Sequence, residues 1–436
     1  MSKGLSGFPE WLPEQELVQQ SLIEIVRRQY ELHGFTPVST RSVELLDDLI
    51  SKGGDTDKEI YVLQRLAPDA ADTARLGLHY DLTVPFARFV VEHQGQLVFP
   101  FRRYQIQPAW RGERPQLGRY REFIQADVDV IGKDSLDIRY DAELLAILRD
   151  TLEAMPIPAV ELLVNNRKLL EGFYRGLGIA EIAGTLRLVD KLPKIGPRGV
   201  RDLLVASGLA EDQAEACLAL ARIECKDGAE LTRVYDLGVK HPLLDQGLDE
   251  LATVLARCPS AGRTSVVAAL HIARGFDYYT GTVVEGVFKE HPALGAVCSG
   301  GRYDNLASKG SGRLPGVGVS IGITRIMGYC EHLGLLQATR RTPAEVLVVV
   351  HNEGDRPRSD DAAARLRARG IPCLVADAAQ AYGKQIRAAE RLGVPYVLFP
   401  ATGAGRDEIR DIQSGKQEVV DLDAWRPETA KTASRR

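Results

Sequence analysis

Two neighbouring segments of the chain alternate between apolar and polar positions with the period of a β-strand. From Ile124 to Val130, every second side chain is apolar. The other face holds an arginine, an aromatic ring, an amide and two carboxylates: Arg121, Phe123, Gln125, Asp127 and Asp129. The alternation is also present in "FRRYQIQPAWRGE", and the connecting "GERPQLG" contains two glycines and a proline. The pattern predicts an antiparallel hairpin with a shared polar face. Such a face suits a charged ligand with a flat ring better than bare water.

Helical periodicity dominates other parts of the chain. Apolar residues recur at helical spacing between Val18 and Tyr30, and Gly34 supplies a stop. "DLTVPFARFVVEH" predicts a turn that enters a helix, and "AELLAILRDTLEAM" predicts another helix. Residues 166–257 are rich in alanine, leucine and charged residues, with few strand signals. We therefore expect this region to be mainly helical.

Strand patterns return after residue 257. They occur in "TSVVAALHIARGFDYYTGTVVEGVF", in "GAVCSGGRYDNL" and in "GVGVSIG", which runs into a helix. After a linker near residues 335–343, short strands alternate with short helices and end in a hairpin around "SGK". This alternation predicts a separate α/β domain with a parallel or mixed sheet.

Length and composition indicate a globular chain of several domains. The 436 residues are 44% hydrophobic and 26% charged, and this length predicts two or three domains. We find no apolar run long enough to span a membrane. The N-terminus lacks the apolar segment of a signal peptide, so a cytoplasmic location is expected.

The cysteines and the net charge exclude some functional classes. The six cysteines include no C-x-x-C pair, which argues against structural zinc and against a disulfide framework. The net charge of −4 argues against a general DNA-binding protein. From Arg340 onward there are 17 basic and 14 acidic residues, a mild excess that is compatible with RNA contact.

A G-x-S-x-G pattern at residues 318–322 is typical of hydrolase nucleophile elbows. Such an enzyme needs an acid and then a histidine downstream of Ser320. Only His332 and His351 follow, and the acids beside them do not complete a plausible triad. The alternative is steric, because glycines let a strand pack closely and leave room for a bulky ligand.

Two further segments group aromatic and basic side chains. "ARGFDYYTGTVVE" contains Arg274, Tyr278 and Tyr279, and "SGGRYDNL" contains Arg302 and Tyr303. Each segment alone is compatible with aromatic packing in a strand.

Taken together, these segments resemble the class II histidyl-tRNA synthetases. "FRRYQIQPAWRGERPQLGRYREF" resembles motif 2 of class II enzymes, and "GVGVSIGITRI" resembles motif 3. "RGFDYYTGTVVE" and "SGGRYDNL" resemble the two segments peculiar to the histidine enzymes. "DLTVPFAR" and "IRDIQSGKQEVVDLD" also fit, so the resemblance covers nearly the whole chain. One departure is Arg41, which occupies the usual position of a motif 1 proline near the dimer interface.

The resemblance implies an α/β fold of the α+β kind. Its core would be the antiparallel sheet of class II synthetases, flanked by helices and followed by an anticodon-binding domain. The implied organisation is a catalytic core at 1–165, a mainly helical insertion at 166–257, the continued core at 258–335, an anticodon-binding domain at 343–425 and a disordered tail at 426–436.

The resemblance also implies an ATP-binding set. Arg111 would bind the α-phosphate, because the N–H groups of a planar guanidinium can donate two parallel hydrogen bonds to phosphate oxygens. Glu113 and Phe123 would hold adenine, and Arg325 would meet the distal end of ATP. Arg121 belongs to the same set. Mg²⁺ would accompany the phosphates, and no zinc is expected.

A second set is implied for histidine. It consists of Asp81, Thr83, Arg111, Gln125, Asp129, Arg274, Tyr278, Tyr279 and Tyr303. Asp81, Thr83 and Gln125 would surround the α-ammonium group. Asp129 and Tyr279 would read the two imidazole nitrogens. Arg274 and Arg111 would act in catalysis, with Arg274 near both the histidine carboxylate and the α-phosphate.

The implied reaction joins ATP, L-histidine and histidine tRNA on a homodimer. The histidine carboxylate attacks the α-phosphorus, and the adenylate then acylates the 3′ end of the tRNA. The alternative is the regulatory subunit of ATP phosphoribosyltransferase, a paralogue that lacks the anticodon-binding domain. A free-standing RNA-binding protein is a third hypothesis, but it would not need the histidine-binding set.

Overall fold

A computed structural model describes residues 4–53, 58–66, 75–273, 278–307, 312–402, 405–427 and 433–435. Arg274 therefore lies outside the described residues. The chain divides into two compact units, one formed by residues 1–9 and 22–333 and the other by residues 10–21 and 334–436. In the described ranges, no helix is both long and apolar enough to cross a membrane.

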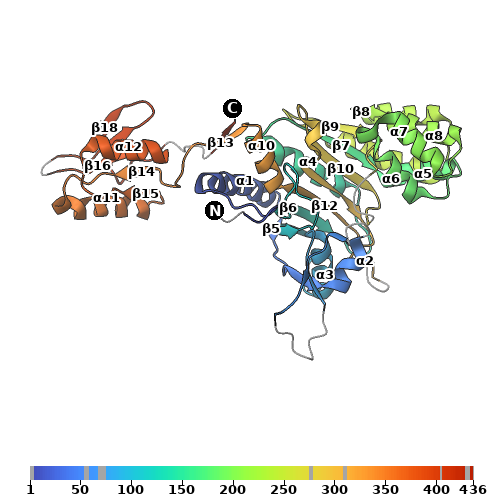
Figure 1. The fold of residues 1–436 in the computed structure, drawn as a ribbon, viewed down its shortest axis with the longest axis horizontal. Coiled ribbons are helices and arrows are strands. Elements are labelled where there is room, and N and C mark those ends of the chain that lie inside the picture. Colours follow the sequence, from blue (N-terminus) through green and yellow to red (C-terminus); the bar gives the residue numbers. More distant parts are fainter. Residues whose placement is uncertain are drawn as a thin grey trace. The chain divides into compact units, whose positions relative to one another are not determined.

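The first unit is built on a nine-stranded sheet in the order β1-β5-β6-β12-β11-β10-β7-β9-β8 (Figure 1). Its strands are β1 Thr36–Pro37, β5 Phe101–Trp110, β6 Glu122–Ile131, β7 Val160–Asn166, β8 Glu224–Cys225, β9 Ser265–Ala269, β10 Thr282–Phe288, β11 Cys298–Tyr303 and β12 Gly316–Gly322. The strands from β5 to β7 in this order are mutually antiparallel. Only the described pairs β1–β5 and β7–β9 are parallel. The antiparallel core that the resemblance implied is thus confirmed.

The β5–β6 pair is the hairpin that the alternation predicts. In its register, Arg103 lies opposite Asp129, and Gln107 lies opposite Gln125. The polar positions of both strands therefore fall on one face, because side chains alternate across a strand. On the other face, the ring of Tyr104 lies 6.0 Å from the ring of Tyr30.

Helices cover the apolar face of the sheet. They include α1 Pro13–Leu32, α4 Arg139–Ala154 and α10 Ile323–His332. The Tyr30 hydroxyl donates to the carbonyl oxygen of Ala126 at 3.2 Å. Helix α10 contacts β6, and α4 contacts β12. The apolar alternation in β6 therefore becomes buried core, with Val128 and Val130 fully inaccessible.

A smaller substructure adjoins this sheet. It comprises β2 Val43–Leu45, α2 Leu46–Gly53, β3 Val62–Leu63, β4 Leu76–Leu78 and α3 Thr83–His93. Phe86 and Val90 of α3 pack into a buried cluster with Ile131 and Tyr303. The start of α3 is thereby fixed beside the polar face of the hairpin.

Residues 166–257 are mainly helical, as the sequence predicts. The region contains α5 Arg167–Gly176, α6 Ile182–Val189, α7 Leu192–Ala206, α8 Glu211–Ala221, the 3₁₀ helix η2 Gly228–Leu237 and α9 Pro242–Arg257 (Figure 1). Helices α5 and α9 approach closely through two glycines. A Cβ atom at Gly172 would lie 2.2 Å from the backbone nitrogen of Leu244, and one at Gly247 would lie 2.2 Å from that of Leu169. The short strand β8 was not expected.

The second unit has the mixed sheet that the alternating pattern predicts, in the order β15-β14-β16-β17-β18. Its elements are β14 Val346–Val348, α11 Arg356–Ala368, β15 Cys373–Val375, α12 Tyr382–Leu392, β16 Tyr396–Phe399, β17 Glu408–Asp411 and β18 Gln417–Val419. Strands β15, β14 and β16 are parallel, and β17 and β18 form the expected hairpin. Short 3₁₀ turns occur in the two units at η3 Pro292–Leu294 and η4 Glu353–Asp355.

The tail differs from the expectation in one segment. Residues 433–435 form strand β19, Ala433–Arg435, which pairs with β13, Leu336–Ala338. The prediction of disorder is therefore wrong for these three residues. The expected tail also includes residues 428–432 and 436, which lie outside the described residues.

Candidate active site

The polar face of the hairpin forms one wall of a pocket in the first unit. Of the thirteen site residues expected from the sequence, nine line this pocket: Asp81, Thr83, Arg111, Glu113, Phe123, Gln125, Asp129, Tyr279 and Arg325. Five further polar side chains that were not assigned also line it: Arg119, Tyr120, Asp127, Ser299 and Ser320. Strands β6, β11 and β12 and the start of α3 therefore bring most of the expected set together.

Tyr278 and Tyr303 lie behind the pocket wall. The Tyr278 hydroxyl donates to Asp81 Oδ2 at 3.2 Å, and the Tyr303 hydroxyl donates to Asp129 Oδ1 at 2.6 Å. The two rings pack edge to face, with centroids 6.2 Å apart. These tyrosines orient the two carboxylates.

Arg121 also lies outside the pocket lining. Its Nε donates to the carbonyl oxygen of Glu113 at 3.2 Å, and its Nη1 donates to that of Ser6 at 3.4 Å. The side chain thus supports the backbone that carries Glu113. Hydrophobic alternation could not distinguish such a supporting arginine from one that faces the pocket.

One end of the pocket is acidic and buried. Asp81, Asp127 and Asp129 are each at most 2% exposed. Arg103 Nη2 pairs with Asp129 Oδ2 at 2.9 Å, and the Arg103 guanidinium lies 4.0 Å from the centroid of the Phe86 ring. Three carboxylates against the single fully buried guanidinium of Arg103 make this end a favourable environment for a cation.

Burial raises the pKa of each of these three carboxyls. The pKa of Asp127 is raised to about 7, because desolvation outweighs the opposing effect of Arg103 and neighbouring Asp129 raises it further. Burial also raises the pKa of Asp129, against Arg103 and the Tyr303 hydrogen bond. The pKa of Asp81 is raised by burial and held down by the Val84 N–H and by Arg111. A bound cation would favour the ionised forms of all three.

The other end of the pocket is rich in arginine. Arg111 Nε donates to the carbonyl oxygen of Tyr80 at 3.0 Å, and its guanidinium lies 5.0 Å from the centroid of the Phe123 ring. Arg325 donates from Nε to the carbonyl oxygen of Gly118 at 3.3 Å. Burial, with Arg119 and Arg111 nearby, lowers the pKa of Arg325. Converging guanidinium groups of this kind suit a polyanion such as a triphosphate.

The glycines of β12 make the acidic end possible. A Cβ atom at Gly318 would lie 1.9 Å from Asp129 Oδ1, and one at Gly316 would lie 2.3 Å from the Tyr303 ring. Ser320 lies inside β12 rather than on a strand-to-helix turn, and its hydroxyl accepts from Gln125 Nε2 at 2.8 Å. The steric interpretation of the G-x-S-x-G pattern is therefore confirmed, and the pattern is not a nucleophile elbow.

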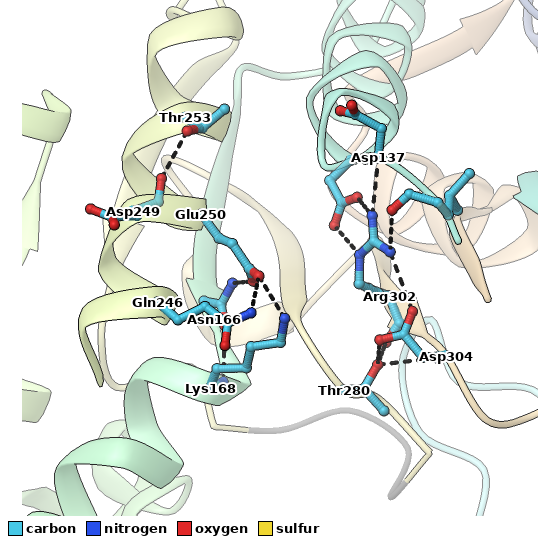
Figure 2. A network of polar contacts seen from close by, with 12 residues as sticks. Asp137, Asn166, Lys168, Gln246, Asp249, Glu250, Thr253, Thr280, Arg302 and Asp304 are labelled. Carbon is cyan, nitrogen blue, oxygen red and sulfur yellow. Dashed lines mark hydrogen bonds and ion pairs between the residues drawn. The ribbon is translucent and has the colours of Figure 1, made fainter. Parts of the chain in front are cut away.

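A buried network around Arg302 holds the segment that carries the pocket tyrosines (Figure 2). Arg302 forms a two-point ion pair with Asp141 and donates to the carbonyl oxygen of Leu136 at 3.0 Å. It also contacts Asp304, whose Oδ2 accepts from the Thr280 hydroxyl at 2.7 Å. Because Thr280 directly follows Tyr278 and Tyr279 in the sequence, Arg302 positions these tyrosines rather than touching a ligand.

A second network joins the insertion to the core (Figure 2). Glu250 of α9 accepts from Asn166 Nδ2 at 2.9 Å and from Lys168 Nζ at 2.5 Å. Nearby, Asn165 Nδ2 donates to the carbonyl oxygen of Ile272 at 2.9 Å, and Arg167 Nη1 donates to that of Ala273 at 2.7 Å. The chain that leads to residue 274 is thus anchored on the junction between β7 and α5.

Comparisons with known proteins give a consistent result. A family model described as histidyl-tRNA synthetase matches residues 7–326, and an anticodon-binding domain model matches residues 345–428. A histidine–tRNA ligase from Cutibacterium acnes is 49% identical over 98% of this chain and 97% of its own length. The crystal structure of histidyl-tRNA synthetase from Nostoc sp. PCC 7120 has a TM-score of 0.85 at 33% identity and covers 97% of both chains.

A more distant structural match is described as an ATP phosphoribosyltransferase regulatory subunit/histidyl-tRNA synthetase from Bacillus halodurans. It has a TM-score of 0.70 at 20% identity, covering 86% of this chain and 92% of that chain. At this identity the match supports the shared fold alone.

Proposed function

Because the chain belongs to the histidyl-tRNA synthetase family, we propose that its pocket activates L-histidine with ATP for transfer to histidine tRNA. The observation that carries this proposal is the polarity of the pocket. Buried carboxylates lie at one end, and arginines converge at the other. An amino acid presents an ammonium group and ATP presents phosphates, so the two ends suit the two substrates.

The arginine end would bind ATP. Arg111 would contact the α-phosphate and Arg325 the distal phosphates, while Phe123 would stack on adenine and Glu113 would accept from its amino group. Mg²⁺ would enter as part of the substrate, bound to phosphate oxygens. Among the residues in the described ranges, no cluster of three acidic, histidine or cysteine side chains could hold a metal by itself. Mg²⁺ in such sites usually keeps several waters and binds through substrate phosphates with one or two carboxylates.

The acidic end would bind histidine. Asp81, Thr83 and Gln125 would surround the α-ammonium group. Asp129 and Tyr279 would form hydrogen bonds to the imidazole ring. Burial raises the pKa of Tyr279, so its hydroxyl stays protonated and can donate. The histidine carboxylate would then face Arg111 and the α-phosphorus. Its attack releases pyrophosphate and leaves histidyl-adenylate, which acylates the 3′-hydroxyl of the tRNA.

Asp129→Asn tests the imidazole-binding role. We expect the KM for histidine to rise about ten- to a hundred-fold, because a hydrogen bond to a charged partner is worth ~1.5–3 kcal/mol. The KM for ATP should change little. Histidine- and ATP-dependent pyrophosphate exchange measures both constants.

The control must account for Arg103, which loses its ion-pair partner in this variant. Thermal melting of the variant establishes whether it is folded. Asp134→Asn, an exposed position on the loop after β6, is the matched substitution. An equal rise in both KM values would remove Asp129 from histidine recognition.

The second unit would bind the anticodon stem of the tRNA. The pocket residues all precede the second unit's main segment, which begins at Gly334, and the anticodon-binding family model matches residues 345–428. We expect a chain ending at Leu333 to form histidyl-adenylate but to charge tRNA poorly at low tRNA concentration. Circular dichroism must first show that this chain is folded. Unimpaired charging at low tRNA concentration would contradict the anticodon-binding role.

Family resemblance also supports a homodimer that works in the cytoplasm. Arg41, at the usual motif 1 proline, pairs through Nη2 with Glu44 Oε2 at 2.9 Å, and Glu44 also pairs with Arg88. Within the protomer, the arginine therefore has a local partner. The regulatory-subunit alternative is less well supported, because the close relatives are ligases and the anticodon-binding domain is present.

A further inference from the structure

Asp127 occupies a central place in the acidic end that the family resemblance did not assign. It lies between Gln125 and Asp129 on the same face of β6 and lines the pocket. Its register partners are Gln105 on β5 and Ser320 on β12, and its side chain is 2% exposed. A carboxylate so deeply placed needs partners, since burial of an unpaired charge is costly.

Two buried acceptor atoms of pocket-lining residues have neither a hydrogen bond nor an ion pair in the part of the chain that the structure describes. They are Asp127 Oδ1 and Gln125 Oε1; a third pocket acceptor, Asp129 Oδ2, also lacks a hydrogen bond but lies 2.9 Å from Arg103 Nη2 in an ion pair. Gln125 is held by its amide nitrogen, which donates to Ser320 Oγ at 2.8 Å. Buried acceptors in a pocket that lack protein donors indicate a ligand that brings donors.

The neighbouring carboxylates are already engaged. Asp81 accepts from the Val84 N–H at 3.0 Å and from the Tyr278 hydroxyl at 3.2 Å. Asp129 accepts from the Tyr303 hydroxyl and pairs with Arg103. Among the three acids, Asp127 thus has the carboxylate oxygen that a ligand can occupy without competing with a protein donor.

The surrounding charges favour a cationic donor. The groups whose charges act on Asp127 are Arg103, Asp129 and Asp81, and the Ser320 hydroxyl also bonds to it. Two of these neighbours are acids, and the single arginine is already paired with one of them. A further positive charge would therefore be stabilised next to Asp127, whereas an anion would be repelled.

We propose that Asp127 is the principal carboxylate partner of the α-ammonium group of bound histidine. This inference rests on the proposed function. Asp127 Oδ1 and Gln125 Oε1 would each accept an ammonium hydrogen, while Asp81 and Thr83 would flank the group. Asp127 therefore determines specificity for the amino group of the substrate, while Asp129 forms a hydrogen bond to its imidazole ring.

The test compares two ligands that differ only in the amino group. Histidine and imidazole-4-propionate, which is histidine without that group, are titrated calorimetrically into wild-type protein and Asp127→Asn. We expect histidine affinity to fall about ten-fold or more, the scale of a hydrogen bond to a charged group. Affinity for imidazole-4-propionate should stay within about two-fold, because that ligand leaves Asp127 Oδ1 unused in both proteins.

Asp134→Asn is the matched control. It makes the same chemical change at an exposed position with φ 67°, which asparagine tolerates. Equal weakening of both ligands by Asp127→Asn, or no weakening of histidine, would overturn the proposal. Failure of the wild type to bind histidine would instead reject the proposed function itself, so the two failures are distinguishable.

A second measurement uses only the wild-type protein, so it does not depend on whether an Asp127 variant folds. The ratio of the two wild-type affinities is followed from about pH 8.5 to 5.5. Each affinity is corrected for the imidazole protonation measured in that free ligand, because the ammonium group lowers the imidazole pKa of histidine relative to that of imidazole-4-propionate. The pKa of Asp127 is raised to about 7, so protonation below that pH removes the anion that the ammonium needs. The preference for histidine should therefore fall as the pH drops through about 7. A ratio independent of pH would contradict the proposal.

Discussion

Arg274→Ala is expected to lower the rate of histidyl-adenylate formation about a hundred-fold or more, the effect of removing one preorganised charge-stabilising group worth ~3 kcal/mol. Negative charge builds on the non-bridging oxygens of the α-phosphate as the histidine carboxylate attacks. A fixed guanidinium beside those oxygens stabilises the transition state more than the ground state. Arg274 lies outside the described residues, so its role is inferred from the family resemblance and from its neighbours in the chain.

Ala273 and Tyr279, which flank residues 274–277 in the sequence, both have defined surroundings. Ala273 is 2% exposed, and its carbonyl oxygen accepts from Arg167 Nη1 at 2.7 Å. On the other side of residues 274–277, Tyr279 lines the pocket. Ala273 and Tyr279 thus flank residues 274–277 in the sequence, and Tyr279 is a pocket residue.

Single-turnover formation of the adenylate at saturating histidine and ATP measures this effect on protein shown to be folded. Arg274→Lys should recover only part of the rate, because a point charge cannot span a carboxylate and a phosphate together. A rate near that of the wild type in Arg274→Ala would remove the residue from the mechanism.

Arg302→Met is expected to lower the free energy of unfolding by about 3–5 kcal/mol, the usual cost of removing one partner of a buried ion pair. Asp141 is 2% exposed, and Arg302 provides its two-point partner. Methionine fills similar volume but leaves the Asp141 carboxylate and the carbonyl oxygen of Leu136 without this donor. Urea denaturation of the two proteins measures the difference.

Arg139→Met provides the matched control, since Arg139 begins the same helix α4 at an exposed position. Its unfolding midpoint should stay close to that of the wild type. Because the Arg302 network also holds Thr280 after the pocket tyrosines, the folded fraction of Arg302→Met should show a raised KM for histidine. An unchanged unfolding midpoint in Arg302→Met would show that the ion pair contributes no net stability.

The local parts of the fold were predictable because their patterns are local. Period-two alternation in β5 and β6 predicted the hairpin and its shared polar face, whereas the register of Arg103 with Asp129 is set by how the two strands pair. The pairing of β6 with β12 was not predictable from any window of sequence. It joins Asp129 to Gly318, which are 189 residues apart in the sequence, and only packing selects it.

The same difference between local patterns and long-range packing explains which parts of the site could be predicted. Family motifs located most of the residues that line the pocket, but motif resemblance does not reveal which side chains support others. Tyr303 was expected to line the pocket and instead donates to Asp129. Arg103 and Asp127 were visible as polar positions on the two strands. Their ion pairing and burial arise from contacts between strands, so their importance emerged only from the structure.

Pyrophosphate exchange into ATP, measured with each of the twenty amino acids separately on the full-length protein, tests whether the pocket activates histidine. We expect exchange that depends on histidine and is absent with the other amino acids at comparable concentration. The acidic end of the pocket would bind any ammonium group, but Asp129 and Tyr279 would select the imidazole ring. Absence of histidine-dependent exchange from folded protein with Mg²⁺ and ATP would contradict histidine activation by this pocket and favour the regulatory-subunit alternative.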